Sequence, residues 1–120
     1  MKISELIERI EKQRPDLNYS NEEYLDMIYS LYDEIYLNVF ATHENCPNKK
    51  TRLCLNDELE LPNRYCDLYF YYLLSQLDFA NADITRYSND MIIFNRLFEE
   101  FEKYYNRNNL PLLKNTVGGY

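Results

Sequence analysis

The chain contains no glycine between Met1 and Val117, and this absence restricts its fold more than any other feature of the sequence. Glycine most readily supplies the positive φ angles of tight hairpin turns, so a fold of short strands joined by such turns is disfavoured. Helices need no glycine, and the sequence is rich in residues that favour them, among them Glu, Leu and Lys. We therefore expect an all-α fold.

Apolar residues recur every three or four positions in several segments, a spacing typical of amphipathic helices. We predict a small bundle of about four helices, over residues 4–13, 21–41, 63–80 and 83–107. The second helix begins with a capping box, in which Ser20 and Glu23 satisfy each other's backbone N–H groups. Pro62 precedes the third helix, at a position where its missing N–H group costs little.

The last predicted helix has the most regular pattern in the chain. Its apolar positions step by three and four residues and so share one side of the helix: Ile84, Tyr87, Met91, Phe94, Phe98, Phe101 and Tyr105. A helix of this length spans about 37 Å, at 1.5 Å per residue. We expect this apolar seam to pack against the rest of the bundle.

Two segments lack helical spacing. Residues 42–60 form an insertion with two open alternatives, a short β-hairpin that turns at Asn56 and Asp57, or an irregular loop. Residues 108–120 form an extended tail, with apolar residues Leu110, Leu112, Leu113, Val117 and Tyr120. The predicted organisation is one helical domain over residues 1–107, which includes the insertion, followed by the tail.

Composition and charge limit the classes of function. Hydrophobic residues make up 46% of the chain and charged residues 28%, which is typical of a globular domain and excludes disorder. The net charge is −7, and basic residues cluster only at Lys49, Lys50 and Arg52, so we expect no specific nucleic-acid binding. No apolar run suits a membrane span, no signal peptide is evident, and the three cysteines lack paired spacing. We expect a reduced, cytoplasmic protein.

Few residues offer catalytic or metal chemistry. His43 is the only histidine, and we place it on the surface at a helix end. Together with Cys46, Cys54 and Cys66 it supplies the donor atoms of a zinc site, but structural zinc sites use close cysteine pairs, which this sequence lacks. Cys66 is instead expected in the core. We predict no catalytic, cofactor-binding or metal site, and therefore a protein that is not an enzyme.

Two aspartates, Asp33 and Asp67, lie within or beside apolar stripes. A carboxylate in such a place needs a partner, and Arg64 and Arg86 are the candidates. A structural ion pair is the favoured interpretation, and a catalytic acid is the alternative.

The segment YCDLYFYYLLSQLDF, residues 65–79, leaves a helix almost no polar face. A surface helix of a small monomer normally has one. We predict that the bundle covers one side of this helix and that a neighbouring subunit covers the other. Tyrosine suits such an interface because its ring is apolar while its hydroxyl group keeps a polar contact. The predicted interface residues are Tyr65, Tyr69, Phe70, Tyr71, Tyr72 and Leu74.

Tyrosine, aspartate and asparagine residues also form a distinctive pattern over residues 61–107, LPNRYCDLYFYYLLSQLDFANADITRYSNDMIIFNRLFEEFEKYYNR. The residues that carry it are Tyr65, Asp67, Leu68, Tyr69, Tyr72, Leu73, Asp78, Asn81, Arg86, Tyr87, Asn89, Phe94, Asn95, Tyr105, Asn106 and Arg107. This pattern resembles small helical proteins from the head-morphogenesis region of tailed phages of Gram-positive bacteria. Such proteins are head–tail connectors, also called adaptor or head-completion proteins. The chain departs from the pattern where Cys66 separates Tyr65 from Asp67.

The resemblance implies a structural virion protein at the head–tail interface, present in the host cytoplasm during assembly. It implies a homo-oligomeric ring of twelve copies below the portal protein. This ring would extend the channel through which DNA passes without specific binding, and would present a platform to the next neck protein. The tail would dock on the portal or on a neighbouring subunit.

Other functions remain open beside the connector. Another neck or tail-completion protein, such as a stopper or a tail terminator, is the nearest alternative. A small helical regulatory or interaction protein would explain the same apolar helix through a two-fold contact.

Overall fold

The structure is a computed structural model that describes residues 1–112. It contains the four predicted helices, α1 (Ile3–Gln13), α2 (Asn21–Asn38), α3 (Asp67–Ala80) and α4 (Ile84–Asn108). Two short 3-10 helices, η1 (Phe40–Thr42) and η2 (Asn63–Tyr65), lie between α2 and α3. The all-α prediction is confirmed. The tail residues Leu113, Val117 and Tyr120 lie outside the described residues.

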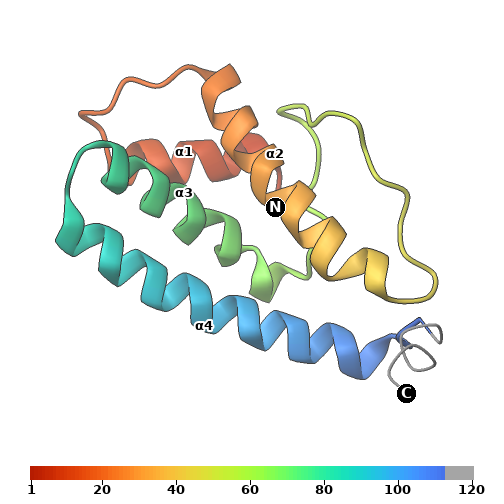
Figure 1. Cartoon of the computed structure of the whole chain (residues 1–120). Helices are drawn as coiled ribbons and strands as arrows, with labels where there is room; N and C mark the ends of the chain where they lie inside the picture. The colour runs from red at the N-terminus through yellow and green to blue at the C-terminus, as the bar shows by residue number, and fades with distance from the viewer. Residues whose placement is uncertain (113–120) are drawn as a thin grey trace.

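The α3 helix is the centre of the arrangement. It forms an antiparallel hairpin with α4, which runs along one side of the molecule, while α1 and α2 contact α3 from the other side (Figure 1). The molecule is elongated, with extents of 52 × 31 × 22 Å, because α4 alone is about 37 Å long. Since α3 meets helices on several sides, it needs little polar surface of its own.

The helix ends follow the predicted caps. Ser20 Oγ accepts a hydrogen bond from the Glu23 N–H at 3.2 Å, and the Glu23 carboxylate accepts one from the Ser20 N–H at 3.0 Å. Asp83 Oδ1 accepts a hydrogen bond from the Arg86 N–H and so caps α4. These bonds satisfy N–H groups that the first turn of a helix leaves without a partner inside the helix.

The predicted seam of α4 is correct in its centre and wrong at its start. Phe94 and Phe101 are buried, but Ile84 is 58% exposed. The carboxylic acid Asp90 takes a buried place on the same side of α4, between the levels of Tyr87 and Phe94. The apolar pattern therefore gave the correct face of the helix and overestimated how far that face is covered.

Residues 43–62 form an irregular loop, so the hairpin alternative for the insertion is wrong. A turn does form, in which the Asp57 N–H donates to the Cys54 carbonyl at 3.0 Å. The residues after this turn pair with the start of the chain, and not with the residues before the turn as a hairpin would require. The Leu59 N–H donates to the Met1 carbonyl, and the Ile3 N–H donates to the Asp57 carbonyl. Within residues 1–112 this contact is only an isolated bridge between Lys2 and Glu58.

Ala82 occupies the turn between α3 and α4 with a φ angle of 59°. A residue with a Cβ atom pays about 1 kcal/mol for this left-handed conformation, which glycine adopts without steric conflict. We expect Ala82→Gly to raise the free energy of unfolding by about 0.5–1 kcal/mol, as measured by urea denaturation. The control is Ala80→Gly in the last turn of α3, which is expected to destabilise. A loss of stability in Ala82→Gly would contradict the assignment of strain to this turn.

Candidate functional site

The predicted interface residues on and before α3 are mostly part of the protein's own core. The exposed fractions are 8% for Tyr65, 2% for Tyr69, 7% for Phe70 and 5% for Leu74, whereas Tyr71 and Tyr72 are partly exposed. Neighbouring elements cover these rings: the Arg9 guanidinium of α1 lies 4.1 Å from the Phe70 ring centre, and Phe94 of α4 packs on Tyr72 at 5.7 Å. The expectation that the second face of α3 lacks a partner within one subunit is therefore wrong.

Exposed apolar side chains occur instead at other positions of the α3–α4 hairpin, none of which belongs to the predicted interface residues. Phe79 is 61% exposed, Ile84 is 58% exposed and Ile92 is 68% exposed. Phe79 packs only partly, on the Tyr87 ring at 5.2 Å between ring centres. Ile84 is the first residue of α4, and Ile92 lies about two turns further along the helix. We call Phe79, Ile84 and Ile92 the exposed hairpin residues.

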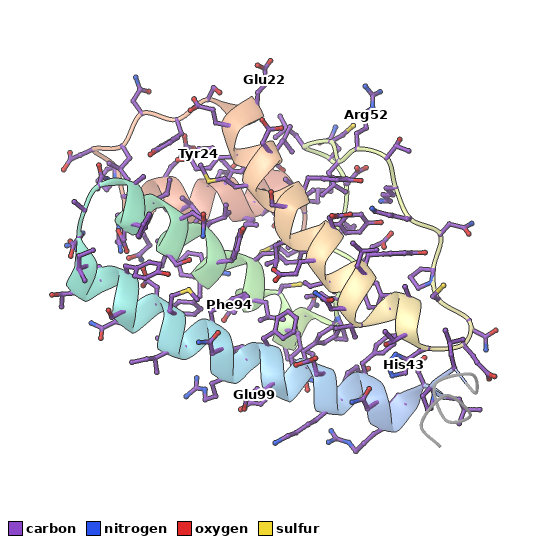
Figure 2. The ribbon with its side chains drawn as sticks, viewed as in Figure 1. Glu22, Tyr24, His43, Arg52, Phe94 and Glu99 are labelled. Atoms are coloured by element: carbon purple, nitrogen blue, oxygen red, sulfur yellow. The ribbon has the colours of Figure 1, made fainter. Side chains whose placement is uncertain are left out.

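The α4 surface separates two kinds of side chain. Figure 2 shows Phe94 directed towards α3, while Glu99 points away from the bundle. Ile92 belongs to the exposed side together with Glu99 and is the apolar exception there. A large exposed apolar residue on an otherwise polar face is a feature of surfaces that contact other proteins.

The described part of the tail lies along the segment after α2. The Glu44 N–H donates to the Leu110 carbonyl at 2.8 Å, and the Leu112 N–H donates to the Thr42 carbonyl at 3.1 Å. Leu110 remains 69% exposed, and Leu112 is partly exposed. The tail therefore starts from a fixed position at the end of α4, and the docking prediction for its apolar residues stays a prediction.

His43 is buried, and the prediction that it lies on the surface is wrong. It is 6% exposed because the tail segment and Tyr105 cover it, with the Tyr105 ring centre at 4.8 Å. Its Nδ1 lies 2.7 Å from the Val39 carbonyl oxygen, which accepts a hydrogen bond from the protonated Nδ1. Its Nε2 lies 2.7 Å from the side-chain amide of Asn106 on α4. The ring thus joins the ends of α2 and α4.

The four proposed zinc donors do not come together. Cys66 is buried in the core, as predicted, and burial raises the pKa of its thiol. Cys46 and Cys54 are exposed, while both ring nitrogens of His43 have other partners. Among residues 1–112 no three His, Cys, Asp or Glu side chains gather in an arrangement that would hold a metal ion.

The predicted ion-pair partners of Asp33 and Asp67 are also wrong. Asp67 pairs with Arg9 of α1 at 3.0 Å, and Asp33 pairs with Lys49 of the loop. Arg64 instead lies over the Tyr65 and Tyr104 rings, and Arg86 pairs with Asp83, three residues before it. The sequence interval between these residues gave no information about which basic side chain reaches which carboxylate.

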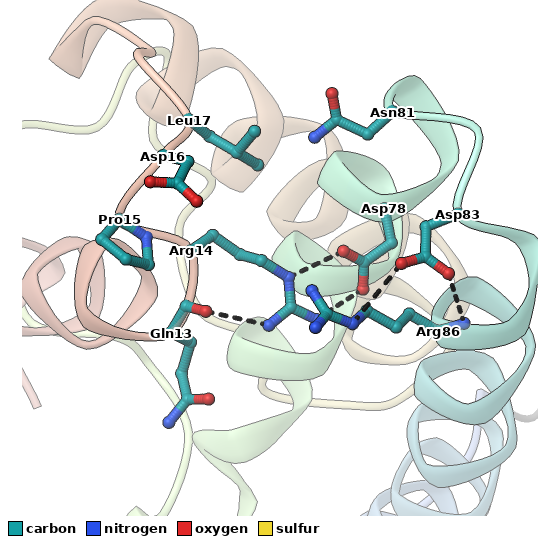
Figure 3. A pocket seen from close by; sticks show the side chains of 9 residues that line it. All are labelled: Gln13, Arg14, Pro15, Asp16, Leu17, Asp78, Asn81, Asp83 and Arg86. Atoms are coloured by element: carbon teal, nitrogen blue, oxygen red, sulfur yellow. Dashed lines mark hydrogen bonds and ion pairs between the residues drawn. The ribbon is translucent and has the colours of Figure 1, made fainter.

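The buried charged cluster of the protein is elsewhere, at the junction of α1 with the α3–α4 hairpin. Arg14, the residue after α1, donates two hydrogen bonds of 2.7 Å to the two carboxylate oxygens of Asp78 on α3 (Figure 3). The Asp78 side chain is 2% exposed, and the Arg14 side chain is 13% exposed. A third N–H group of Arg14 donates to the Gln13 carbonyl. This two-point geometry is the strong form of an arginine–carboxylate pair.

A cavity of about 230 Å³ adjoins this pair. Its lining is the loop after α1, the end of α3 and the start of α4, with residues Gln13, Arg14, Pro15, Asp16, Leu17, Asp78, Asn81, Asp83 and Arg86 (Figure 3). The lining contains both charge signs, and its two guanidinium groups pair with Asp78 and Asp83. The charged groups of the cavity are therefore largely neutralised by one another.

Asp90 of α4 lies close enough to Asp78 for the two carboxyl groups to share a hydrogen bond when one of them is protonated. Asp90 is 7% exposed, and its Oδ2 atom has no hydrogen-bond partner among the described residues. Burial, together with the hydrogen bond and the negative charge of Asp78, raises the pKa of Asp90 to about 7. Burial alone would also raise the pKa of Asp78, but the hydrogen bonds from Arg14 and Asp90 outweigh it and hold that pKa below its usual value.

Comparison with protein-family models, curated proteins and solved structures gives no match. Within the described residues, no helix combines the length and the apolar character that crossing a membrane requires.

Proposed function

We propose that this chain is the structural subunit of a ring below the phage portal, which joins the head to the tail and extends the DNA channel. The proposal is carried by the exposed hairpin residues Phe79, Ile84 and Ile92. In a monomer their apolar side chains are exposed to water, whereas a contact with another subunit would bury them. It is also supported by the resemblance of residues 61–107 to head–tail connectors. Twelve subunits, matching the portal, would make the ring.

The exposed hairpin residues indicate where a neighbouring subunit would bind. A ring needs a heterologous contact, in which one surface of a subunit meets a different surface of the next. The second surface would include Leu37, which is 56% exposed at the end of α2, and Leu110. The C-terminal ends of α2 and α4, next to which these residues lie in the sequence, are at the opposite end of the molecule from the α3–α4 turn (Figure 1). Tyr71 and Tyr72 would add contact area where they are not already covered.

The alternatives predict different partners. A stopper or a tail terminator would bind another neck protein and not the portal itself. A small regulatory protein would form a two-fold dimer, in which the same surface meets itself. A portal gene in the same genome is a requirement of the proposal, and its absence would overturn it.

The experiment is co-purification of the chain with the portal protein of the same genome, followed by imaging of the particles by electron microscopy. We expect a ring on the portal with the wild-type chain and no ring with the double variant Ile84→Asp and Ile92→Asp. The binding should weaken at least about a hundredfold, because each buried aliphatic side chain contributes roughly 1.5–3 kcal/mol. Since both side chains are exposed, the variant should keep its helical content.

The matched control adds two acidic residues at exposed positions of α2, Asn21→Asp and Ser30→Asp. This control should decorate portals as the wild-type chain does. A chain without residues 113–120 separates the role of the tail from that of the hairpin, because it retains the hydrogen bonds of Leu110 and Leu112. Normal decoration by the Ile84 and Ile92 variant would contradict the proposed interface.

A further inference from the structure

Two buried carboxyl groups meet one guanidinium group at the junction of α1, α3 and α4. Arg14 uses two of its N–H groups for Asp78 and another for the Gln13 carbonyl. Asp90 lies against Asp78 on the facing helix but receives no N–H group from Arg14. An ionised carboxylate is acceptor-only, so two ionised carboxylates in contact have no hydrogen between them. Their contact needs one proton.

The surrounding charges do not replace that proton. The charged groups around Asp90 come from each element at the junction: Asp78 on α3, Arg14 after α1, and Arg86 and Asp83 at the start of α4. Arg86 pairs with Asp83 and is 59% exposed, so its charge is partly screened by solvent. The two guanidinium groups therefore balance Asp78 and Asp83, and a charged Asp90 would be the unbalanced member.

We propose that Asp78 and Asp90 share one proton, and that its loss opens the contact between α1 and the α3–α4 hairpin. With the proton present, the protonated oxygen of Asp90 donates to Asp78, and Asp78 stays free to hold Arg14. Without the proton, the two carboxylates repel each other across the hairpin, and the Arg14 anchor of α1 weakens. Because the pKa of Asp90 is about 7, this transition falls close to neutral pH.

The direction of the pH effect follows from the raised pKa. Between the ordinary value of 3.8 and about 7, the folded chain keeps a proton on Asp90 that the unfolded chain has lost. Stability therefore falls as the pH rises through this window, and the loss is complete above it. The lowered pKa of Asp78 acts at more acidic pH, where stability falls as the pH decreases.

The first measurement follows the side-chain carboxyl carbons of the wild-type protein by NMR during a pH titration. We expect one carboxyl group of the pair to titrate near pH 7. Titration of both Asp78 and Asp90 below pH 5 would overturn the proposal. This measurement needs no variant, so it is decisive even where a substitution prevents folding.

The second measurement is amide hydrogen exchange at pH 5.5 and pH 8.5, corrected for the intrinsic exchange rate at each pH. The reporters are the amides of Arg14, which donates to Ile10, and Asp83, which donates to Asp78. We expect their protection to fall at least about tenfold at the higher pH, the equivalent of one pKa unit. The reference is the Val39 amide at the far end of α2, whose protection should change much less. An equal change at Val39 would contradict a local opening.

The variant Asp90→Asn keeps a donor next to Asp78 at every pH, because the side-chain amide replaces the protonated carboxyl group. We expect it to abolish the pH dependence of the Arg14 and Asp83 amides. The control Asp26→Asn, at an exposed position of α2, should leave that dependence unchanged. Persistence of the full pH dependence in Asp90→Asn would overturn the proposal.

Discussion

Replacing Arg14 by methionine is expected to lower the free energy of unfolding by about 3–5 kcal/mol, the usual cost of breaking a buried ion pair. Methionine keeps much of the apolar stem of arginine, so the loss reports mainly the missing guanidinium group. Asp78, 2% exposed, would lose both of its 2.7 Å hydrogen bonds while still facing Asp90. Urea denaturation followed by circular dichroism measures the change.

The pH dependence of this variant tests the cause. Arg14 holds the pKa of Asp78 below its usual value, so the stability that the pair contributes is present above pH 3.8 and is lost as the pH falls. The difference between the variant and the wild-type chain should therefore shrink in acid. A constant difference across the pH range would show that the variant loses packing and not an ion pair.

Two further variants serve as controls for the Arg14 effect. Arg9→Met removes the partner of Asp67, but this pair is 39% and 48% exposed, so its loss should cost about 1 kcal/mol or less. The double variant Arg14→Met and Asp78→Leu leaves no unpaired charge at the former ion pair and should recover part of the lost stability. Equal losses in Arg9→Met and Arg14→Met would contradict the importance of burial.

The helices were predictable because their signals are local. The Ser20 capping box needs only residues within one turn, and the seam of α4 needs only the spacing of its own apolar residues. The capping box was confirmed and the seam was correct in its centre, because local hydrogen bonds and helix periodicity depend little on the rest of the chain. Even the irregular insertion was among the alternatives, because a chain without a glycine at the Asn56–Asp57 turn has no strong hairpin signal.

The charged junction was not predictable in the same way. Arg14 and Asp78 are 64 residues apart, so their contact depends on how α1 packs on α3. The burial of Asp90 could have been predicted from the sequence, because Asp90 lies on the apolar side of α4 between Tyr87 and Phe94. The same limit applies to His43, which is buried because Tyr105 of α4 and the residues after α4 lie against the end of α2. Predicting contacts between distant segments requires knowing how whole helices pack against one another.

The tyrosine-rich helix shows how the same limit affects a functional prediction. Its sequence correctly indicated that α3 is buried on more than one side, but it did not indicate whether other helices of the same chain or a second subunit cover it. In the structure α1, α2 and α4 all contact α3, so four of the six predicted interface residues are core residues. The exposed apolar positions of the hairpin are Phe79, in the last turn of α3, and Ile84 and Ile92 on α4. A test of assembly therefore belongs on the hairpin, and a test of the core belongs where α4 meets η1 and η2.

Replacing Phe101 by alanine is expected to lower the free energy of unfolding by about 3–5 kcal/mol, because it removes the centre of an aromatic cluster. Phe101 is 1% exposed, and its ring lies 5.4 Å from Tyr65, 6.2 Å from Phe40 and 6.0 Å from Tyr105 between ring centres. These rings come from η2, η1 and α4, so the cavity would lie where these three elements meet. Urea denaturation followed by circular dichroism measures the change.

The position of the amides that exchange faster in Phe101→Ala tests the role of the cluster more sharply than the size of the stability loss. In Phe101→Ala, hydrogen exchange should accelerate first at the Val39 and His43 amides, which lie beside the cluster, and later at the Arg14 amide near the other end of α4. Ile92→Ala on the same helix is the control, because a side chain that is 68% exposed should cost less than about 0.5 kcal/mol. A loss in Phe101→Ala as small as that in Ile92→Ala would mean that α4 is stabilised by its own helical propensity and not by the cluster. That outcome would also remove the reason for the regular apolar seam, since a helix that needs no packing needs no buried face.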